Sequence, residues 1–141
     1  MSQHPVRRNI SSRNPYEDVV GYSRAVRVGG SVWVAGTTAT VDGVVVGVGD
    51  PYEQARVAFG IALNAVRTAG LDTADVVRTR MFVADIAHFD EIGRAHRELF
   101  DQVRPVATMV QVTAFAHPDH LVEIEIEAHR APQGWRARLG S

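Results

Sequence analysis

The sequence predicts an α+β fold in which two helices pack on one face of a mixed sheet. Strand-like and helix-like segments follow one another in the order β-β-β-α-β-α-β-β, which is typical of such a layer. The chain has 141 residues, 45% of them hydrophobic and 22% charged, which is enough for one hydrophobic core. We predict a single domain at 16–131, with an N-terminal arm at 1–15 and a C-terminal tail at 132–141 that lack hydrophobic periodicity.

Three short strands are predicted before the first helix. Residues 22–28 and 31–35 alternate in character and are joined by Gly29 and Gly30, which suit the positive φ angles of a tight hairpin. Residues 44–46 are predicted as the third strand.

The first helix has clear start and stop signals. Asp50 can cap it, Pro51 suits its first position, and Glu53 can reach back to the cap amide. Gly70 is predicted to end it. An apolar stripe at helical spacing is formed by Ala55, Phe59, Ala62, Leu63 and Val66.

The second half of the chain contains three more strands and one helix. Residues 76–83 are rich in residues that favour strands, and 89–100 form an amphipathic helix. Residues 107–112 and 121–130 are predicted as the last two strands. No helix remains to cover the second face of the sheet, although large apolar side chains point to it. We therefore expect another subunit to cover that face.

Charged side chains alternate along two of these strands. Glu123, Glu125 and Glu127 share one face of the last strand, and Arg78 and Arg80 share one face of the central strand. One interpretation is cross-strand ion pairing on the helix-free face. The other is that one carboxylate lies at a subunit boundary and transfers protons or orients water.

The composition disfavours several classes of function. The chain has 15 Arg residues and no Lys or Cys, which excludes Schiff-base lysines and thiol chemistry. The net charge of −1 disfavours a nucleic-acid partner. His117 and His120 flank a turn without a third clustered ligand, so no metal is expected. We expect no membrane partner and a cytoplasmic location, because no long apolar segment or signal sequence is evident.

Several segments together resemble the Rid (YjgF) family. The residues Gly-Tyr-Ser-Arg-Ala-Val at 21–26 and Val-Ala-Gly at 34–36 resemble the family's Pro-Tyr-Ser-Gln-Ala and Ser-Gly-Gln segments. Residues 71–85 resemble its central strand, and 104–112 with 122–128 resemble its C-terminal signature. The resemblance implies a chorismate-mutase-like fold and a homotrimer with a cleft between each pair of subunits.

The resemblance also implies an activity and site residues. Members of the family hydrolyse enamines and imines to ketoacids and ammonia, without a cofactor. Tyr22 stands at the position of the family's cleft tyrosine, Gly36 at its backbone-binding glycine, and Glu125 at the glutamate that positions water. Thr37 replaces a glutamine beside that glycine.

One position departs from the family in a way that affects substrate binding. Ala107 stands where the family has the arginine that binds the substrate carboxylate, and it is expected on a strand that faces Glu125. Gly93 replaces an asparagine of the cleft. These changes place the chain in a divergent subgroup that lacks the usual catalytic arginine.

Two other arginines are candidates for the missing group. Arg24 or Arg80 would line the cleft, together with Met109 beside Ala107; otherwise the substrate is not an α-imino acid. The favoured function is hydrolysis of a small reactive enamine, imine or related nitrogenous metabolite at an intersubunit cleft. The alternative is a non-catalytic trimer that binds a small molecule. Ribonuclease activity is a third hypothesis, which the net charge of −1 disfavours.

Overall fold

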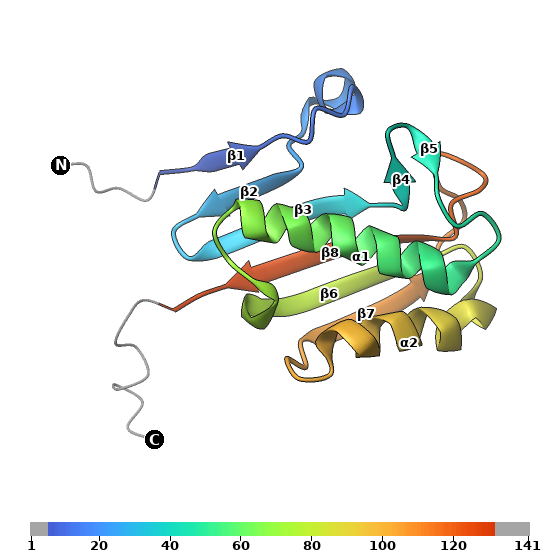
Figure 1. Cartoon of the computed structure of the whole chain (residues 1–141). Coiled ribbons are helices and arrows are strands. Elements are labelled where there is room, and N and C mark those ends of the chain that lie inside the picture. The colour runs from blue at the N-terminus through green and yellow to red at the C-terminus, as the bar shows by residue number, and fades with distance from the viewer. Residues whose placement is uncertain (1–5, 132–141) are drawn as a thin grey trace.

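A six-stranded mixed sheet with two long helices on one face forms the protein in the computed structural model, which describes residues 6–131 (Figure 1). The strand order is β1-β2-β3-β8-β6-β7, in which β6 and β7 are parallel and the other neighbours are antiparallel. The sheet strands are β1 (Arg8–Ile10), β2 (Ala25–Val28), β3 (Ser31–Thr37), β6 (Val76–Val83), β7 (Val106–Gln111) and β8 (Val122–His129). The predicted α+β class is confirmed.

The helix α1 (Pro51–Thr68) begins where its sequence signals predicted. The Asp50 carboxylate accepts a hydrogen bond from the Glu53 N–H at 3.0 Å and so caps the helix. The expected return contact from the Glu53 side chain does not form, because that carboxylate pairs with Arg56 at 2.8 Å. The short helices are η1 (Glu17–Gly21), η2 (Thr73–Asp75) and η3 (Ile86–His88).

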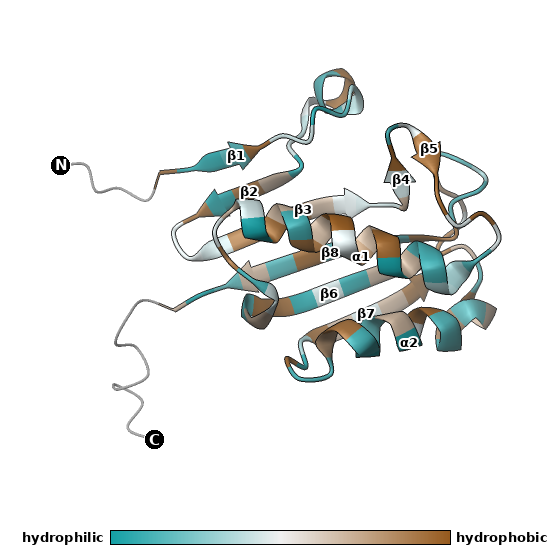
Figure 2. Cartoon of the chain, viewed as in Figure 1, coloured by the Kyte–Doolittle hydropathy of each residue, from teal (hydrophilic) through white to brown (hydrophobic). Residues whose placement is uncertain are grey.

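The core lies between the sheet and the helices α1 and α2 (Phe89–Phe100). Figure 2 shows hydrophobic and hydrophilic residues alternating along β6 and β8, because successive side chains of a strand point to opposite faces. Ile124 and Ile126 of β8 are fully buried on the helix side, where Phe59 and Phe100 of the helices are also fully buried. The helix side of the sheet therefore forms the hydrophobic core, and the opposite face lies outside that core.

Two parts of the chain differ from the prediction. The segment predicted as an N-terminal arm contains β1, which pairs antiparallel with β2, whereas the predicted tail at 132–141 lies outside the described residues. The third predicted strand does not join the main sheet. It contributes β5 (Val44–Val45), which pairs with β4 (Thr40–Val41) in a separate two-stranded ribbon.

The helix-free face of the sheet carries Trp33 and the three glutamates of β8. The side chain of Trp33 is 46% exposed, which is unusual for so large an apolar residue. No helix among residues 6–131 is long and apolar enough to cross a membrane.

Candidate functional site

The strand β3 is interrupted by a bulge beside β8. Val34 pairs with Ile126 and Thr37 with Ile124, so Ala35 and Gly36 together stand opposite Glu125 alone. Such a bulge bends a strand and changes the direction of its side chains, and bulges are frequent next to active sites.

The bulge places the Gly36 backbone against the carboxylate of Glu123. A Cβ atom added at position 36 would overlap a carboxylate oxygen of Glu123, so only glycine permits this approach. The Thr37 side chain is fully buried, and its hydroxyl donates to the Ala35 carbonyl at 2.8 Å. Thr37 therefore stabilises the bulge, and its hydroxyl is already engaged within the strand.

Arg24 connects the bulge to the start of β2. Its guanidinium donates to the Gly36 carbonyl at 2.7 Å, and its own carbonyl accepts from the Ala35 N–H at 2.9 Å. Its Nε is buried without a hydrogen-bond partner among residues 6–131. Burial lowers the pKa of Arg24, and the nearby Tyr22, Glu17 and Glu123 act in the opposite direction. The guanidinium thus holds the bulge in place and balances negative charge around it.

Glu123 has the environment that proton transfer requires. Burial raises the pKa of Glu123, the neighbouring Glu125 charge raises it further, and Arg24 partly opposes both effects. A partly desolvated carboxyl of this kind takes up and releases protons nearer neutral pH than an exposed one. The prediction favoured Glu125 because of the family resemblance, since alternation alone does not distinguish the glutamates of β8.

Glu125 and Glu127 instead belong to a row of cross-strand ion pairs. Arg80 contacts Glu127 at 2.8 Å and Glu125 at 3.5 Å, and Arg78 lies 3.6 Å from Glu127. The side chain of Glu125 is 37% exposed. These contacts match the ion-pair interpretation of the two strands, and they leave the Arg80 guanidinium engaged with two carboxylates.

Tyr22 lies between η1 and β2 rather than within the predicted strand. Its N–H donates to the Glu17 carbonyl at 3.0 Å. Glu17 is buried, and its carboxylate accepts from the Ser11 hydroxyl at 2.8 Å and from the Ser12 N–H and hydroxyl at 2.9 and 2.7 Å. Burial opposes ionisation, but these hydrogen bonds outweigh it and lower the pKa of Glu17. Glu17, which no sequence pattern marked, therefore anchors the segment that carries Tyr22.

We call Tyr22, Arg24, Gly36 and Glu123 the bulge site. Its members come from the residues before β2, from β3 and from β8, and they are linked by the Arg24–Gly36 hydrogen bond and by the close approach of Glu123 to Gly36.

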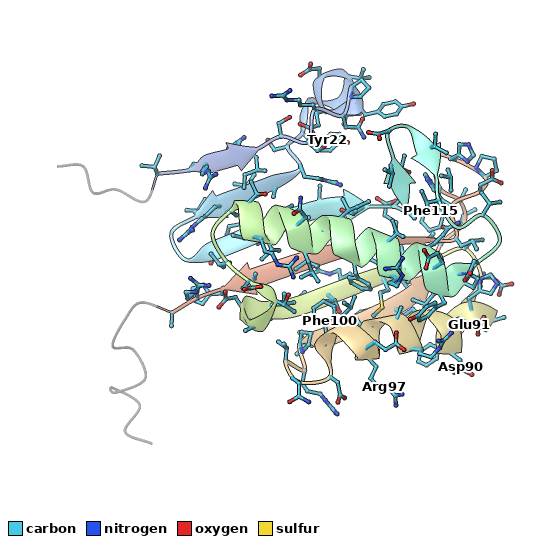
Figure 3. All side chains as sticks on the ribbon, in the orientation of Figure 1. Tyr22, Asp90, Glu91, Arg97, Phe100 and Phe115 are labelled. Atoms are coloured by element: carbon cyan, nitrogen blue, oxygen red, sulfur yellow. The ribbon has the colours of Figure 1, made fainter. Side chains whose placement is uncertain are left out.

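Ala107 and Met109 lie on β7, an edge strand of the sheet that β6 separates from β8. They pair with Thr79 and Met81, whose side chains are buried on the helix side. The expectation that the strand of Ala107 faces Glu125 does not hold within one chain, because β6 lies between the two strands and the two side chains point to opposite faces. Figure 3 shows Tyr22 near η1 and the α2 residues at the other edge. A single chain does not bring all the predicted site residues together.

The histidine pair predicted to be solvated surface lies in the loop before β8. The rings of His117 and His120 are 5.4 Å apart, and His117 Nδ1 accepts from the Asp119 N–H at 3.0 Å. No group of three metal-ligating side chains occurs in the described part of the chain. Both histidines have hydrogen-bond partners within the loop and the ribbon, since His120 Nε2 lies 2.9 Å from the Thr40 hydroxyl.

Comparison with known proteins agrees with this geometry. Residues 13–130 match the family model described as Endoribonuclease L-PSP. An uncharacterised protein of Streptomyces coelicolor is 47% identical over 130 residues, which are 92% of this chain and 96% of that protein. Human 2-iminobutanoate/2-iminopropanoate deaminase is 30% identical over 129 residues, which are 90% of this chain and 93% of that enzyme.

Solved structures show the same fold. A YjgF-family member from Mycobacterium tuberculosis superposes with a TM-score of 0.81 at 45% identity, over 89% of this chain and all of that chain. The E. coli protein TdcF, determined with bound serine, has a TM-score of 0.73 at 26% identity, over 88% of this chain and 94% of that chain. The family match, the relatives and the shared sheet together show that this chain belongs to the YjgF, or Rid, family.

Proposed function

We propose that the protein hydrolyses a small enamine, imine or related nitrogenous metabolite. An enamine first becomes an imine by proton transfer to carbon. Water then adds to the C=N bond, and the resulting carbinolamine releases ammonia to leave a C=O group. Overall, one imine and one water yield one carbonyl compound and one ammonia, with no oxidant, reductant or metal required.

The observation that carries this proposal is the environment of Glu123. Addition of water needs a base to accept its proton, and departure of ammonia needs an acid to supply one. A carboxyl whose pKa is raised by burial serves both steps. We therefore assign the proton-transfer role to Glu123, with Glu125 as the neighbouring charge that raises its pKa, in place of the direct role first expected of Glu125.

The other members of the bulge site have supporting roles in this proposal. Because Gly36 has no side chain, the Glu123 carboxylate can lie against the backbone. The Arg24 guanidinium holds this backbone by donating to the Gly36 carbonyl. The Tyr22 hydroxyl is the proposed hydrogen-bonding group for the substrate. Arg80 and Arg24 both have partners within the chain, so the proposal assigns neither of them the role of the arginine missing at Ala107.

A trimer with shared clefts is part of the proposal. The exposed Trp33 on the helix-free face supports a subunit contact there. The bulge site is built around the central strands β3 and β8, whereas Ala107 and Met109 lie on the edge strand β7, beyond β6. A cleft between subunits would bring the bulge site of one chain to the β7 edge of the next.

The proposed cellular location is the cytoplasm, which cell fractionation tests.

The direct experiment measures hydrolysis of 2-iminopropanoate generated enzymatically from alanine. The imine is trapped by semicarbazide, and the protein competes for it. We expect the purified protein to lower the trapped fraction and to raise ammonia release above the spontaneous rate. An imine without a carboxylate, assayed in parallel, shows whether the anionic group is needed. No acceleration with either compound would contradict the proposal.

The second candidate is a trimer that binds a small molecule without converting it. Ala107 favours it, because a lost guanidinium removes a charge-assisted contact that family members make to an anionic substrate. Calorimetric binding of the same compounds without ammonia release would support this candidate. Cleavage of RNA, assayed alongside, would instead favour the activity in the name of the family model.

A further inference from the structure

A hollow of about 170 Å³ lies at the C-terminal end of α2, beside the start of β7. Its volume suits a small metabolite rather than a drug-sized ligand, for which pockets of about 300 Å³ or more are usual. It is lined by His96, Arg97, Phe100, Asp101, Arg104 and Pro105. A second, wider hollow of about 380 Å³ on the same helix shares Arg97 with the first.

The charges around the first hollow leave one guanidinium without a partner. Arg104 donates to the Asp101 carboxylate at 2.7 Å and to the Asp101 carbonyl at 2.8 Å, so these two charges offset each other. Arg94, at the wider hollow, lies over the Tyr52 ring at 3.8 Å. Arg97 is exposed at the hollow, and no side-chain hydrogen bond or ion pair within residues 6–131 includes it. Figure 3 shows it projecting outward from α2.

The floor of the hollow is apolar and has no charge near neutral pH. Phe100 is 1% exposed, and its ring contacts the His96 ring with centroids 4.7 Å apart. His96 Nε2 is hydrogen-bonded to the Thr79 hydroxyl at 2.8 Å. Burial lowers the pKa of His96, which keeps the imidazole neutral at pH 7. A ligand that fits this surface has a small uncharged body and one anionic end.

We propose that this hollow binds a small carboxylate, with Arg97 as the guanidinium that contacts the carboxylate and Pro105, above the buried Phe100, as the contact for the hydrocarbon part. The position of the hollow gives it a role at the proposed cleft. Ala107 pairs with Thr79, which is hydrogen-bonded to His96, so the hollow adjoins the place where an arginine is missing. Arg97 thereby supplies from α2 the carboxylate contact that Ala107 does not. The choice of 2-oxo acids as ligands rests on the proposed function, whose products they are.

The test is a titration of the full-length protein, ¹³C-labelled at histidine, with pyruvate and with acetone. Pyruvate has the carboxylate and acetone lacks it, at nearly the same size. We expect pyruvate to shift the His96 ring resonances saturably and acetone to leave them unchanged. In Arg97→Gln the affinity should fall about tenfold or more, as for a lost charge-assisted contact. Arg97→Lys should recover part of it.

The matched control is Arg56→Gln, which removes an exposed arginine of α1 that pairs with Glu53 away from the hollow. It should bind pyruvate as the unmodified protein does. Unchanged His96 resonances with pyruvate, or equal binding by Arg97→Gln, would overturn the inference. Because this readout needs no turnover, binding without imine hydrolysis would overturn the proposed function alone, and hydrolysis without binding at His96 would overturn the inference alone.

Discussion

At the scale of single residues, the raised pKa of Glu123 lowers stability at neutral pH and suits the side chain to proton transfer. Its pKa is raised above the ordinary 4.5 because burial disfavours the carboxylate form. A raised carboxyl pKa contributes stability below the unfolded pKa, and this contribution is lost as the pH rises through the folded pKa. At neutral pH the ionised group is therefore a net cost to folding. Residues with such a cost are often retained for function.

Replacement of this acid should therefore stabilise the fold. We expect Glu123→Gln to raise the Tm at pH 7 by a few degrees, because the amide carries no charge to bury. The difference should shrink as the pH is lowered toward 4.5, where the native carboxyl is protonated. Thermal unfolding followed by circular dichroism at several pH values measures this. A lower Tm at pH 7 would show that the carboxylate is stabilising.

His96 should make stability depend on pH in the opposite direction. Burial lowers its pKa from the ordinary 6.5, so its contribution is complete above pH 6.5 and is lost as the pH falls through the folded pKa. We expect the free energy of unfolding to fall between pH 7.5 and 5, and to fall less in His96→Gln. His129→Gln, which changes an exposed histidine, is the matched control. Urea unfolding at both pH values measures this, and equal slopes in all three proteins would contradict it.

At the scale of elements, long periodic segments were predicted well and short ones were not. The strand at 76–83 and the helix at 89–100 occur with the predicted bounds, because repeated burial on one face specifies each of them locally. The three-residue strand β1 was missed, because its pairing with β2 is a non-local contact that leaves no periodicity.

The site residues likewise divide into those that the sequence identified and those that depend on non-local contacts. The positions of Tyr22 and Gly36 were identified from the family resemblance, and the structure places Gly36 against Glu123 and Tyr22 two residues before Arg24. The choice between Glu123 and Glu125 depends on the bulge and on the ion pairs of Arg80. Both are contacts between strands far apart in sequence, so alternation along β8 does not reveal them.

The bulge can be tested with a pair of glycine substitutions. A methyl group at position 36 would displace the Glu123 carboxylate, so Gly36→Ala should lower turnover at least tenfold and change stability little, because the displaced atoms are the end of a flexible side chain. Gly60, in the middle of α1, faces open space. Gly60→Ala should therefore stabilise the protein by about 0.5–1 kcal/mol and leave turnover unchanged. Steady-state kinetics and urea unfolding separate the two, and full activity in Gly36→Ala would show that the close approach is dispensable.

At the scale of the whole molecule, the uncovered sheet face predicts assembly. We expect light scattering at micromolar concentration to give about 46 kDa, three times the 15.4 kDa of one chain. Trp33→Asp should dissociate the assembly, because it places a charge on the exposed apolar part of this face. Asn64→Asp adds the same charge on α1, on the opposite side of the sheet, and should leave the mass unchanged. A mass near 15 kDa for the unmodified protein would contradict both the trimer and the cleft shared between subunits.

The central claim is that Glu123, rather than its neighbour Glu125, transfers protons in the bulge site. The most direct measurement is imine hydrolysis by Glu123→Gln and Glu125→Gln, each checked for an unchanged oligomeric mass. We predict that Glu123→Gln loses about 100-fold or more in kcat, the scale of a lost acid–base group. Glu125→Gln should stay within about tenfold, since it removes only a charge that raises the pKa of Glu123. Full activity in Glu123→Gln, with the large loss confined to Glu125→Gln, would contradict the claim.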